Sequence, residues 1–171
     1  MVPEEGYEER MLAAFVQKPE KMGYYRMAWG RFHVNGIFRF TWCWSWWGFF
    51  GTWAYLLYRK AYLAAVVTFG AGLLFGSFPF FGSLIFAVIM GGIGPYFIMR
   101  RYRDVKEEIE ATVEDEATRI ETMEQMGGYH RWVIWVVALM YAVIFAAALI
   151  GVLSGEMGQY QIEHMEYHYS Y

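Results

Sequence analysis

The sequence has 171 residues, of which 57% are hydrophobic, 21% are aromatic and only 18% are charged, and its formal net charge is −3. A soluble domain of this length could not bury so much apolar side chain, so the composition predicts a membrane protein, while the lack of a basic stripe argues against nucleic-acid binding. The single cysteine, Cys43, excludes an internal disulfide and is expected to be a small buried apolar residue.

Residues 1–36 begin with acidic side chains and lack the basic start, apolar core and cleavage site of a signal peptide, so no cleaved leader is expected. Two short amphipathic helices are predicted, one from Pro3 to about Lys18 and one beginning at Pro19. Their apolar stripes consist of Met11, Leu12, Phe15 and Val16, and of Met22, Tyr25, Trp29 and Phe32. This cytoplasmic region would lie on a membrane surface or pack against the rest of the protein.

Residues 37–60 concentrate tryptophans and end in two cations. Because Arg39 precedes residues 40–58 and Arg59 and Lys60 follow them, a full crossing would export a basic N-terminal region, against the positive-inside rule. We therefore predict an aromatic re-entrant or interfacial helix with both ends in the cytoplasm; a fourth span with an external N-terminus is the alternative. The predicted membrane-interface anchors are Trp42, Trp44, Trp46, Trp47, Trp53, Arg59 and Lys60.

Two further segments predict crossings. Residues 61–99 carry no charge and are too long for one span of about 20 residues, and the turn formers of GSFPFFGS divide 61–100 into a helical hairpin with arms near 61–77 and 82–100. Within 129–153, the stretch from Trp132 is uncharged and of spanning length. The predicted fold class is an all-α integral membrane protein with three transmembrane helices.

The cations predict the orientation of these spans. Arg59 and Lys60 precede the hairpin, Arg100 and Arg101 follow it, and Arg131 precedes the last span. All of them are expected in the cytoplasm, so the N-terminus is cytoplasmic and the hairpin turn faces outward. The Tyr- and His-rich tail, residues 154–171, has no Lys or Arg and is expected to be periplasmic or extracellular.

Residues 101–128 predict an acidic cytoplasmic helix that ends at Gly127 and Gly128 and could continue straight from the second hairpin arm. Its acids point in different directions, which favours a solvated face over a cation site. Its narrow apolar stripe predicts docking, either on the N-terminal helices of this chain or on another chain. The predicted interface residues of the stripe are Val105, Ile109, Val113 and Ile120.

Small residues in the hairpin predict close helix packing. Gly72 and Gly76 form a G-x-x-x-G in the first arm, and Gly91, Gly92 and Gly94 precede Pro95 in the second. Packing within the hairpin is favoured over a dimer interface or a substrate path. Both uncharged stretches lack ionisable residues, which argues against a proton-coupled transporter.

A resemblance to a known family rests on four features in order: Phe15-Val16, the pair Tyr24-Tyr25, Phe40 with Trp42, and Tyr58-Arg59-Lys60. Over residues 15–100 the chain resembles a family of small bacterial inner-membrane proteins defined by a domain of unknown function (DUF2628). The chain departs from that pattern at Gln17, where Gly is usual, and at Thr41, where Asn is usual. The resemblance implies a multi-pass protein of the bacterial inner membrane and brings no reaction with it.

The sequence contains no G-x-S-x-G, no H-E-x-x-H, no Walker loop and no paired cysteines, so no catalytic residue and no cofactor is predicted. His164 and His168 would share a face of a helical tail and are the weak candidate metal ligands, although contacts by the tail's tyrosines are favoured. The predicted function is a non-catalytic accessory or scaffold subunit, whose partners are the lipid bilayer and other membrane subunits or copies of itself. The alternatives are a homo-oligomeric channel or small-solute pore, and a metal-binding membrane protein that uses the His pair.

Overall fold

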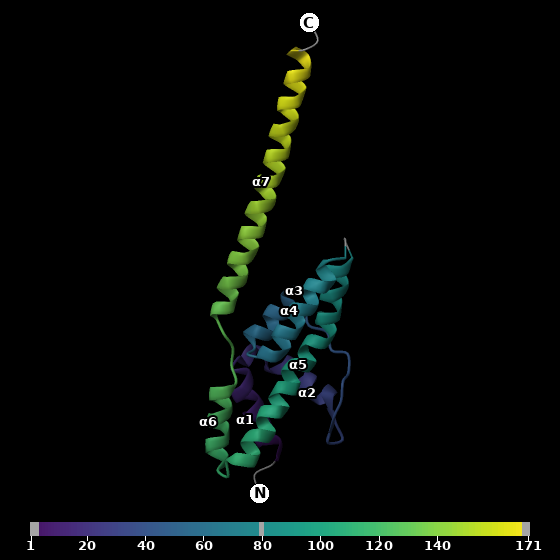
Figure 1. Ribbon diagram of the computed structural model, residues 1–171. Helices are drawn as coiled ribbons and strands as arrows, with labels where there is room; N and C mark the ends of the chain where they lie inside the picture. Colours follow the sequence, from purple (N-terminus) through teal and green to yellow (C-terminus); the bar gives the residue numbers. More distant parts are fainter. Residues whose placement is uncertain (1–3, 79–80, 169–171) are drawn as a thin grey trace. The chain divides into compact units, whose positions relative to one another are not determined.

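The computed structural model describes residues 4–78 and 81–168, without the side chains of residues 4, 5, 153 and 155–168. The chain is mostly helical (Figure 1) and divides after Arg131 into two units, each of which is described by itself. The first unit contains α1 (Glu4–Val16), the short 3-10 helix η1 (Pro19–Lys21), α2 (Met22–Phe32), β1 (His33–Val34), β2 (Ile37–Phe38), α3 (Trp46–Tyr58), α4 (Tyr62–Gly76), α5 (Gly82–Thr112) and α6 (Glu116–Met126). The second unit is α7 (Trp132–His168).

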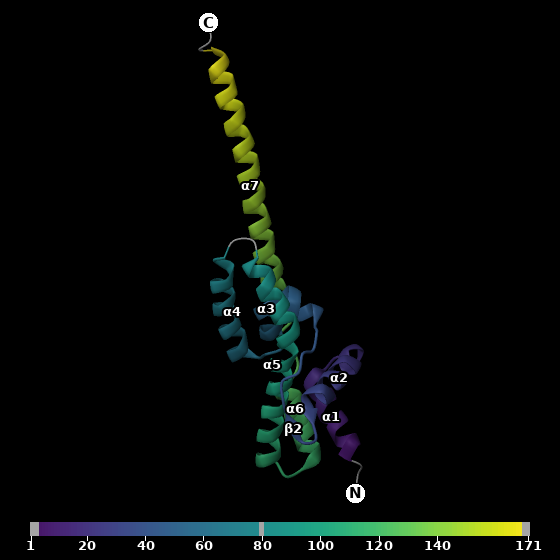
Figure 2. The same cartoon turned by 90° about the vertical axis from the view of Figure 1, so that its right-hand side faces the viewer.

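Helices α4 and α5 form a hairpin in which α4 lies beside the first half of α5 (Figure 2). The rings of Phe75 and Phe86 pack across it with their centroids 5.5 Å apart. Gly82 begins α5 where a Cβ atom would lie 2.0 Å from the carbonyl oxygen of Phe75, so only glycine lets the two helices start this close together.

Two helices in the described part of the chain are long and apolar enough to cross a membrane, α5 and the Trp132–Val152 part of α7. Helix α4 is apolar but has 15 residues, fewer than the roughly 20 that a straight crossing needs. Of the three predicted spans, the second hairpin arm and the C-terminal helix therefore have spanning length, and the first arm is shorter than predicted.

The aromatic segment, defined as residues 40–58, is helical in its second part only. Helix α3 begins at Trp46, where the Ser45 hydroxyl accepts a hydrogen bond from the Gly48 N–H over 3.2 Å and caps the helix. Residues 40–44, the first part of the segment, belong to no helix. The chain also contains a small hairpin, in which β1 and β2 are joined by Asn35-Gly36 with positive φ at both residues. The extended start of the segment corrects the prediction of one aromatic helix there, and the fold is mostly helical with a small two-stranded hairpin.

Helix α3 is broken at Thr52, whose φ of 40° and ψ of −116° lie outside the helical region. These angles are close to the first central position of a type II′ turn, which strongly favours glycine, and they are strained for a β-branched residue. Thr52→Gly is therefore expected to stabilise the protein by about 1–2 kcal/mol, measured by unfolding in mixed micelles. Thr52→Ala keeps the strain and serves as the control; equal stability of the two variants would contradict the strain.

The acidic region is not one straight helix, in contrast to the prediction. Helix α5 ends at Thr112, residues 113–115 turn, and α6 returns along α5 so that the Met126 carbonyl accepts a hydrogen bond from Arg101 over 2.8 Å. Asp115 caps α6, because its carboxylate accepts hydrogen bonds from the N–H and the hydroxyl of Thr118 over 2.8 and 2.7 Å. The turn was readable as an N-cap residue followed by a new helix.

The Asp115 cap predicts an acid-sensitive α6. The Thr118 hydroxyl and N–H lower the pKa of the Asp115 carboxyl below its usual value. Because the folded-state pKa is depressed, the cap contributes stability above the unfolded-state pKa of about 3.9 and loses it as pH falls through the folded-state pKa. Hydrogen exchange of residues 116–126 should therefore accelerate below about pH 4. Asp115→Asn keeps a capping oxygen and should lack this step; an identical pH profile for both proteins would contradict the prediction.

Helix α1 packs among α2, α5 and α6. This part of the first unit, made of α1, α2, α6 and the second half of α5, is called the polar end here. Phe15 is 1% exposed and its ring lies 5.2 Å from that of Tyr102 of α5. The rest of this core includes the buried Met11, Ile109 and Met123. The predicted amphipathic stripe of the first helix thus covers other helices of the same chain.

Three consecutive residues of α1 form ion pairs with three different helices. Glu8 pairs with Lys106 of α5, Glu9 with Arg26 of α2, and Arg10 with Glu116 of α6. The side chains of the last two pairs are between 42% and 61% exposed, so each pair contributes little stability. Together the three pairs link α1 to α2, α5 and α6.

Candidate functional site: the aromatic segment on the glycine–proline helix

The aromatic segment is attached to the middle of α5 through a carbonyl group that a proline leaves free. In an α-helix each N–H bonds to the carbonyl four residues back, and Pro95 has no N–H to give to Gly91. The Ser45 N–H donates to the Gly91 carbonyl over 2.7 Å, and the Cys43 N–H donates to the Gly92 carbonyl over 3.3 Å. Non-helical backbone is tolerated in an apolar environment only when its polar groups are paired in this way.

Glycines make this close approach possible. A Cβ atom on Gly48 would lie 2.7 Å from the carbonyl oxygen of Met90, and one on Gly92 would lie 2.2 Å from the indole of Trp42. A Cβ atom on Gly91 would likewise be crowded by the indole of Trp44. The glycine cluster before Pro95 was predicted to bring helices close together, and the structure places the aromatic segment there.

The segment enters and leaves at the same end of the apolar part of α5. The Phe40 ring lies 5.4 Å from that of Tyr96, and the chain turns back after reaching Gly91. At its far end the Arg59 carbonyl accepts a hydrogen bond from Arg101 over 2.7 Å. Gly91 and Arg101 are ten positions apart, which is about 15 Å along a helix. The path is therefore that of a loop that goes in beside α5 and comes back.

Hydroxyl groups and a thiol form a cluster where the segment meets α2. The Tyr24 hydroxyl donates to the Trp44 carbonyl over 3.0 Å and lies 3.9 Å from the Cys43 sulfur. The Tyr25 and Tyr55 hydroxyls are 3.3 Å apart, and both residues are buried. These contacts join α2, the extended start of the segment, and α3.

The cluster is a hydrogen-bond network of three tyrosine hydroxyls and a thiol. Burial, and next the neighbouring Cys43 thiol, raise the pKa of the Tyr24 hydroxyl above its usual value, so it stays a neutral donor at physiological pH. Among the described residues, the polar contacts of Cys43 are with the Tyr24 hydroxyl and the α5 backbone. Neither of these groups is a base that would activate a thiol. The arrangement holds elements together and matches the predicted small buried role of Cys43.

The predicted membrane anchors divide into two groups. Trp46 and Trp47 are exposed, at 62% and 67%, and Trp42 is half exposed, so these indoles are available to a surrounding phase. Trp44 and Trp53 are partly buried and Lys60 is partly buried. Arg59 is 3% exposed and donates to the Val16 carbonyl over 2.9 Å. Arg59 is therefore a buried link between α3 and α1, which corrects its prediction as an exposed anchor.

The predicted interface residues mostly meet partners within the chain. Val105 and Ile109 are buried in the core, while Val113 and Ile120 are partly buried against it. The same-chain alternative, docking on the N-terminal helices, therefore accounts for this stripe. A Cβ on Gly72 would lie 3.1 Å from Phe86 across the hairpin, whereas Gly76 has no atom within 4 Å in the described part of the chain.

The candidate metal ligands cannot be placed. The side chains of His164 and His168 lie outside the described ones, so the His-pair hypothesis stays a prediction. In the described part of the chain, no group of three or more His, Cys, Asp or Glu side chains is arranged to hold a metal ion.

Sequence reasoning missed several residues of this site. Ser45 as the cap of α3, Gly48 at the closest approach and the Tyr25–Tyr55 pair were not singled out as a group. One signal was available, because a proline inside a predicted helix always frees a carbonyl for another donor. Which donor takes it depends on chain segments about fifty residues away and is not encoded locally.

Comparisons with protein-family models, with curated proteins and with solved structures found no match to this chain. The resemblance to the DUF2628 family therefore stays a prediction, carried by the residues quoted above. The chain itself presents a loop of aromatic residues that glycines and a proline hold against an apolar helical hairpin.

Proposed function

We propose that this chain is a non-catalytic accessory or scaffold subunit embedded in a membrane. The observation that carries the proposal is the exposed apolar surface of the hairpin, which has no charged residue from 61 to 99. Its most exposed large side chains include Leu63, Val66, Leu74, Phe78 and Phe81, between 67% and 81% exposed. Patches of this kind on a folded protein mark a membrane or a protein interface.

The path of the aromatic segment supports a re-entrant loop over a fourth span. Both of its ends lie against the same end of the apolar part of α5, and that end is followed by Arg100 and Arg101. In the proposed arrangement the N-terminal helices and the α5–α6 turn share the cytoplasmic side, as the positive-inside rule requires.

The second unit supports a separate crossing. Between Trp132 and Val152 helix α7 carries large apolar side chains that are exposed on all its faces, among them Trp135, Leu139 and Phe145. A helix that is apolar all round is stable only when buried in lipid or protein. In the proposal this helix carries the tail to the periplasmic or extracellular side of a bacterial inner membrane.

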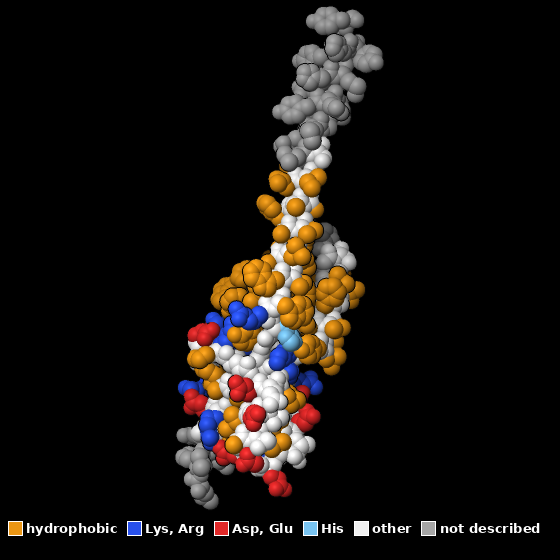
Figure 3. All heavy atoms as spheres, turned by 90° about the vertical axis from the view of Figure 1, so that its left-hand side faces the viewer, with side chains coloured by type: hydrophobic (Ala, Val, Ile, Leu, Met, Phe, Trp, Pro, Cys, Tyr) orange, Lys and Arg blue, Asp and Glu red, His pale blue; other side chains and the backbone are white. Residues whose placement is uncertain are grey.

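The polar end offers the surface for a partner subunit. Figure 3 shows acidic side chains at this end, interspersed with basic ones, and hydrophobic side chains gathered away from it. With the apolar stripe of α6 already packed on α1, the exposed acids of α6, such as Glu121 and Glu124, remain for contacts with another protein. We propose that this acidic end, outside the membrane, is where other subunits attach.

Single cysteines in a Cys43→Ser background test the orientation. Ser77→Cys lies at the exposed hairpin turn and Gln125→Cys on an exposed position of α6. A membrane-impermeant maleimide applied to intact cells should label the first variant, and should label the second only after permeabilisation. Equal labelling of both variants in intact cells would contradict the arrangement.

Gentle detergent extraction followed by intact-complex mass spectrometry tests the scaffold role. The tagged full-length chain should leave the membrane with a reproducible set of other membrane subunits. Extraction as a defined ring of identical copies, with solute flux after reconstitution into vesicles, would overturn the scaffold role in favour of a pore.

One observation favours that second candidate, a homo-oligomeric pore. The break at Thr52 interrupts α3 inside the apolar region, and broken helices at membrane depth occur where backbone groups line a cavity or a binding site. A difference in solute flux between vesicles that contain the Thr52→Gly variant and vesicles that contain the parent protein would support the pore.

A further inference from the structure

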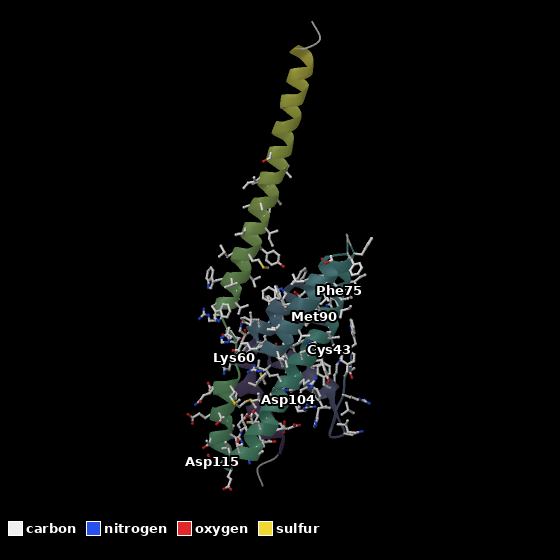
Figure 4. The ribbon with its side chains drawn as sticks, viewed as in Figure 1. Cys43, Lys60, Phe75, Met90, Asp104 and Asp115 are labelled. Atoms are coloured by element: carbon white, nitrogen blue, oxygen red, sulfur yellow. The ribbon has the colours of Figure 1, made fainter. Side chains whose placement is uncertain are left out.

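Four cations gather where α3, α5 and residues 127–131 meet, and they are called the cationic collar here. Its members are Lys18, Arg59, Lys60 and Arg101. Figure 4 shows Lys60 between the apolar end, marked by Phe75 and Met90, and the polar end, marked by Asp104 and Asp115. The collar therefore lies at the boundary between the two kinds of surface.

Main-chain carbonyls hold the two arginines of the collar. Arg101 donates to the Arg59 carbonyl over 2.7 Å and to the Met126 carbonyl over 2.8 Å. Arg59 donates to the Val16 carbonyl, and its guanidinium carbon lies 4.7 Å from the Tyr25 ring centroid. Arg101 of α5 thus joins the ends of α3 and α6, and Arg59 joins the end of α3 to α1 and α2.

The two lysines lie beside the same junction. Lys18 Nζ is 4.5 Å from the ring centroid of Tyr129 and 5.5 Å from that of Tyr58, which stack on each other at 5.1 Å. Burial lowers the pKa of the Lys60 ammonium, and the like charge of Arg101 lowers it further.

The collar has no acidic partner in the part of the chain that the structure describes. Within residues 4–78 and 81–152, none of the four cations forms an ion pair with a carboxylate. Arg59 Nε is buried and has no hydrogen-bond partner among the described residues. Unpaired charge at low dielectric is costly, because repulsion between the cations is poorly screened there. An oxyanion at the collar would relieve the repulsion between the cations and would accept hydrogen bonds from their unused donor groups.

We propose that the cationic collar binds the phosphate of an anionic phospholipid headgroup. The phosphate oxygens would accept from the lysine ammonium groups, while the acyl chains would lie along the exposed apolar side chains of α4. This site rests on the membrane embedding proposed above, and it adds a defined ligand to it. Basic pockets at the cytoplasmic ends of membrane helices bind such headgroups by the same chemistry.

Lipid titration of the full-length chain in detergent tests the site. Phosphatidylglycerol should raise the melting temperature and be retained in intact mass spectra, and phosphatidylcholine should do so much less. The double variant Lys18→Gln/Lys60→Gln should weaken phosphatidylglycerol binding by about fivefold for each lysine removed. Arg31→Gln/Arg39→Gln removes the same charge from exposed positions outside the collar and should leave binding unchanged.

Each contrary result has a distinct meaning. Equal binding of both lipids, or unchanged binding in the collar variant, would overturn the site. An equal melting shift with inorganic phosphate would assign the collar to a soluble phosphate and overturn the lipid. Lys18→Arg/Lys60→Arg should retain binding, which separates loss of charge from misfolding. Extraction by alkaline carbonate tests membrane embedding independently of lipid charge, so failure of the embedding is recognised separately.

Discussion

Gly48→Ala is expected to destabilise the protein by about 1–3 kcal/mol, the usual cost of overpacking a tight contact. The added Cβ would lie 2.7 Å from the carbonyl oxygen of Met90. The obstructing atom belongs to the backbone of α5 and cannot rotate away, so α3 must move off α5. Unfolding in mixed detergent micelles, followed by tryptophan fluorescence, measures the loss, because the aromatic segment supplies most of the signal.

Two alanine variants serve as matched controls for that result. Gly94→Ala places its Cβ 3.5 Å from the Tyr55 ring, an ordinary contact distance, and Gly70→Ala meets no atom within 4 Å among the described residues. Both should be as stable as the parent or slightly more stable, because alanine favours helix over glycine. Equal losses for all three variants would show that the close approach of Gly48 to α5 is not specific.

Phe15→Ala should have the largest effect at the polar end, a loss of about 3–5 kcal/mol. The ring is 1% exposed and packs on Tyr102, and the Phe15 carbonyl also accepts a hydrogen bond from Gly128. Its removal leaves a cavity among α1, α5 and α6. Hydrogen exchange should then show faster exchange in residues 4–16 and 116–126 than in the hairpin.

The controls for Phe15 separate a cavity from a general loss of apolar surface. Phe15→Leu keeps most of the volume and should lose much less stability. Ile37→Ala truncates a side chain that is 67% exposed on β2 and should be nearly neutral. Similar losses in Phe15→Ala and Ile37→Ala would contradict the role of Phe15 in the core.

Local patterns in the sequence located many of the helix boundaries. The predicted first helix ends near Lys18, and α1 ends at Val16; the predicted start at Pro19 is the start of η1. The turn formers around Pro79 separate α4 from α5. Such boundaries depend on caps, prolines and glycines that act within a few residues, so they can be read without knowing the fold.

The aromatic segment shows where local reading failed. Its composition predicted one helix, yet its first residues are extended along α5. The reason is competition for hydrogen bonds: the N–H groups of Cys43 and Ser45 bond to carbonyls of Gly92 and Gly91 instead of to their own chain. A periodicity argument does not include such a distant acceptor.

Arg59 shows the same limit for a charged side chain. Its place before an uncharged stretch predicted a headgroup contact, because cations flank membrane spans. In the fold the Val16 carbonyl and the Tyr25 ring lie beside it, so a residue of apparent surface type is buried. Two short-range patterns, by contrast, do indicate local structure. Asn35-Gly36 indicates the β1–β2 hairpin, and Asp115 with Thr118 indicates the start of α6.

By itself the sequence determined that the chain is mostly helical and carries its charge outside the stretch from 61 to 99, and two of the three spans it predicted have spanning length. These properties follow from the amino-acid composition and from the spacing of hydrophobic residues, both of which are read from short stretches of the chain. Only the tertiary structure decided that the aromatic segment turns back at Gly91, that α6 covers α1, and that four cations meet at one boundary. Those features depend on which distant groups satisfy one another's hydrogen bonds, volume and charge, and such pairings arise only when the chain is folded.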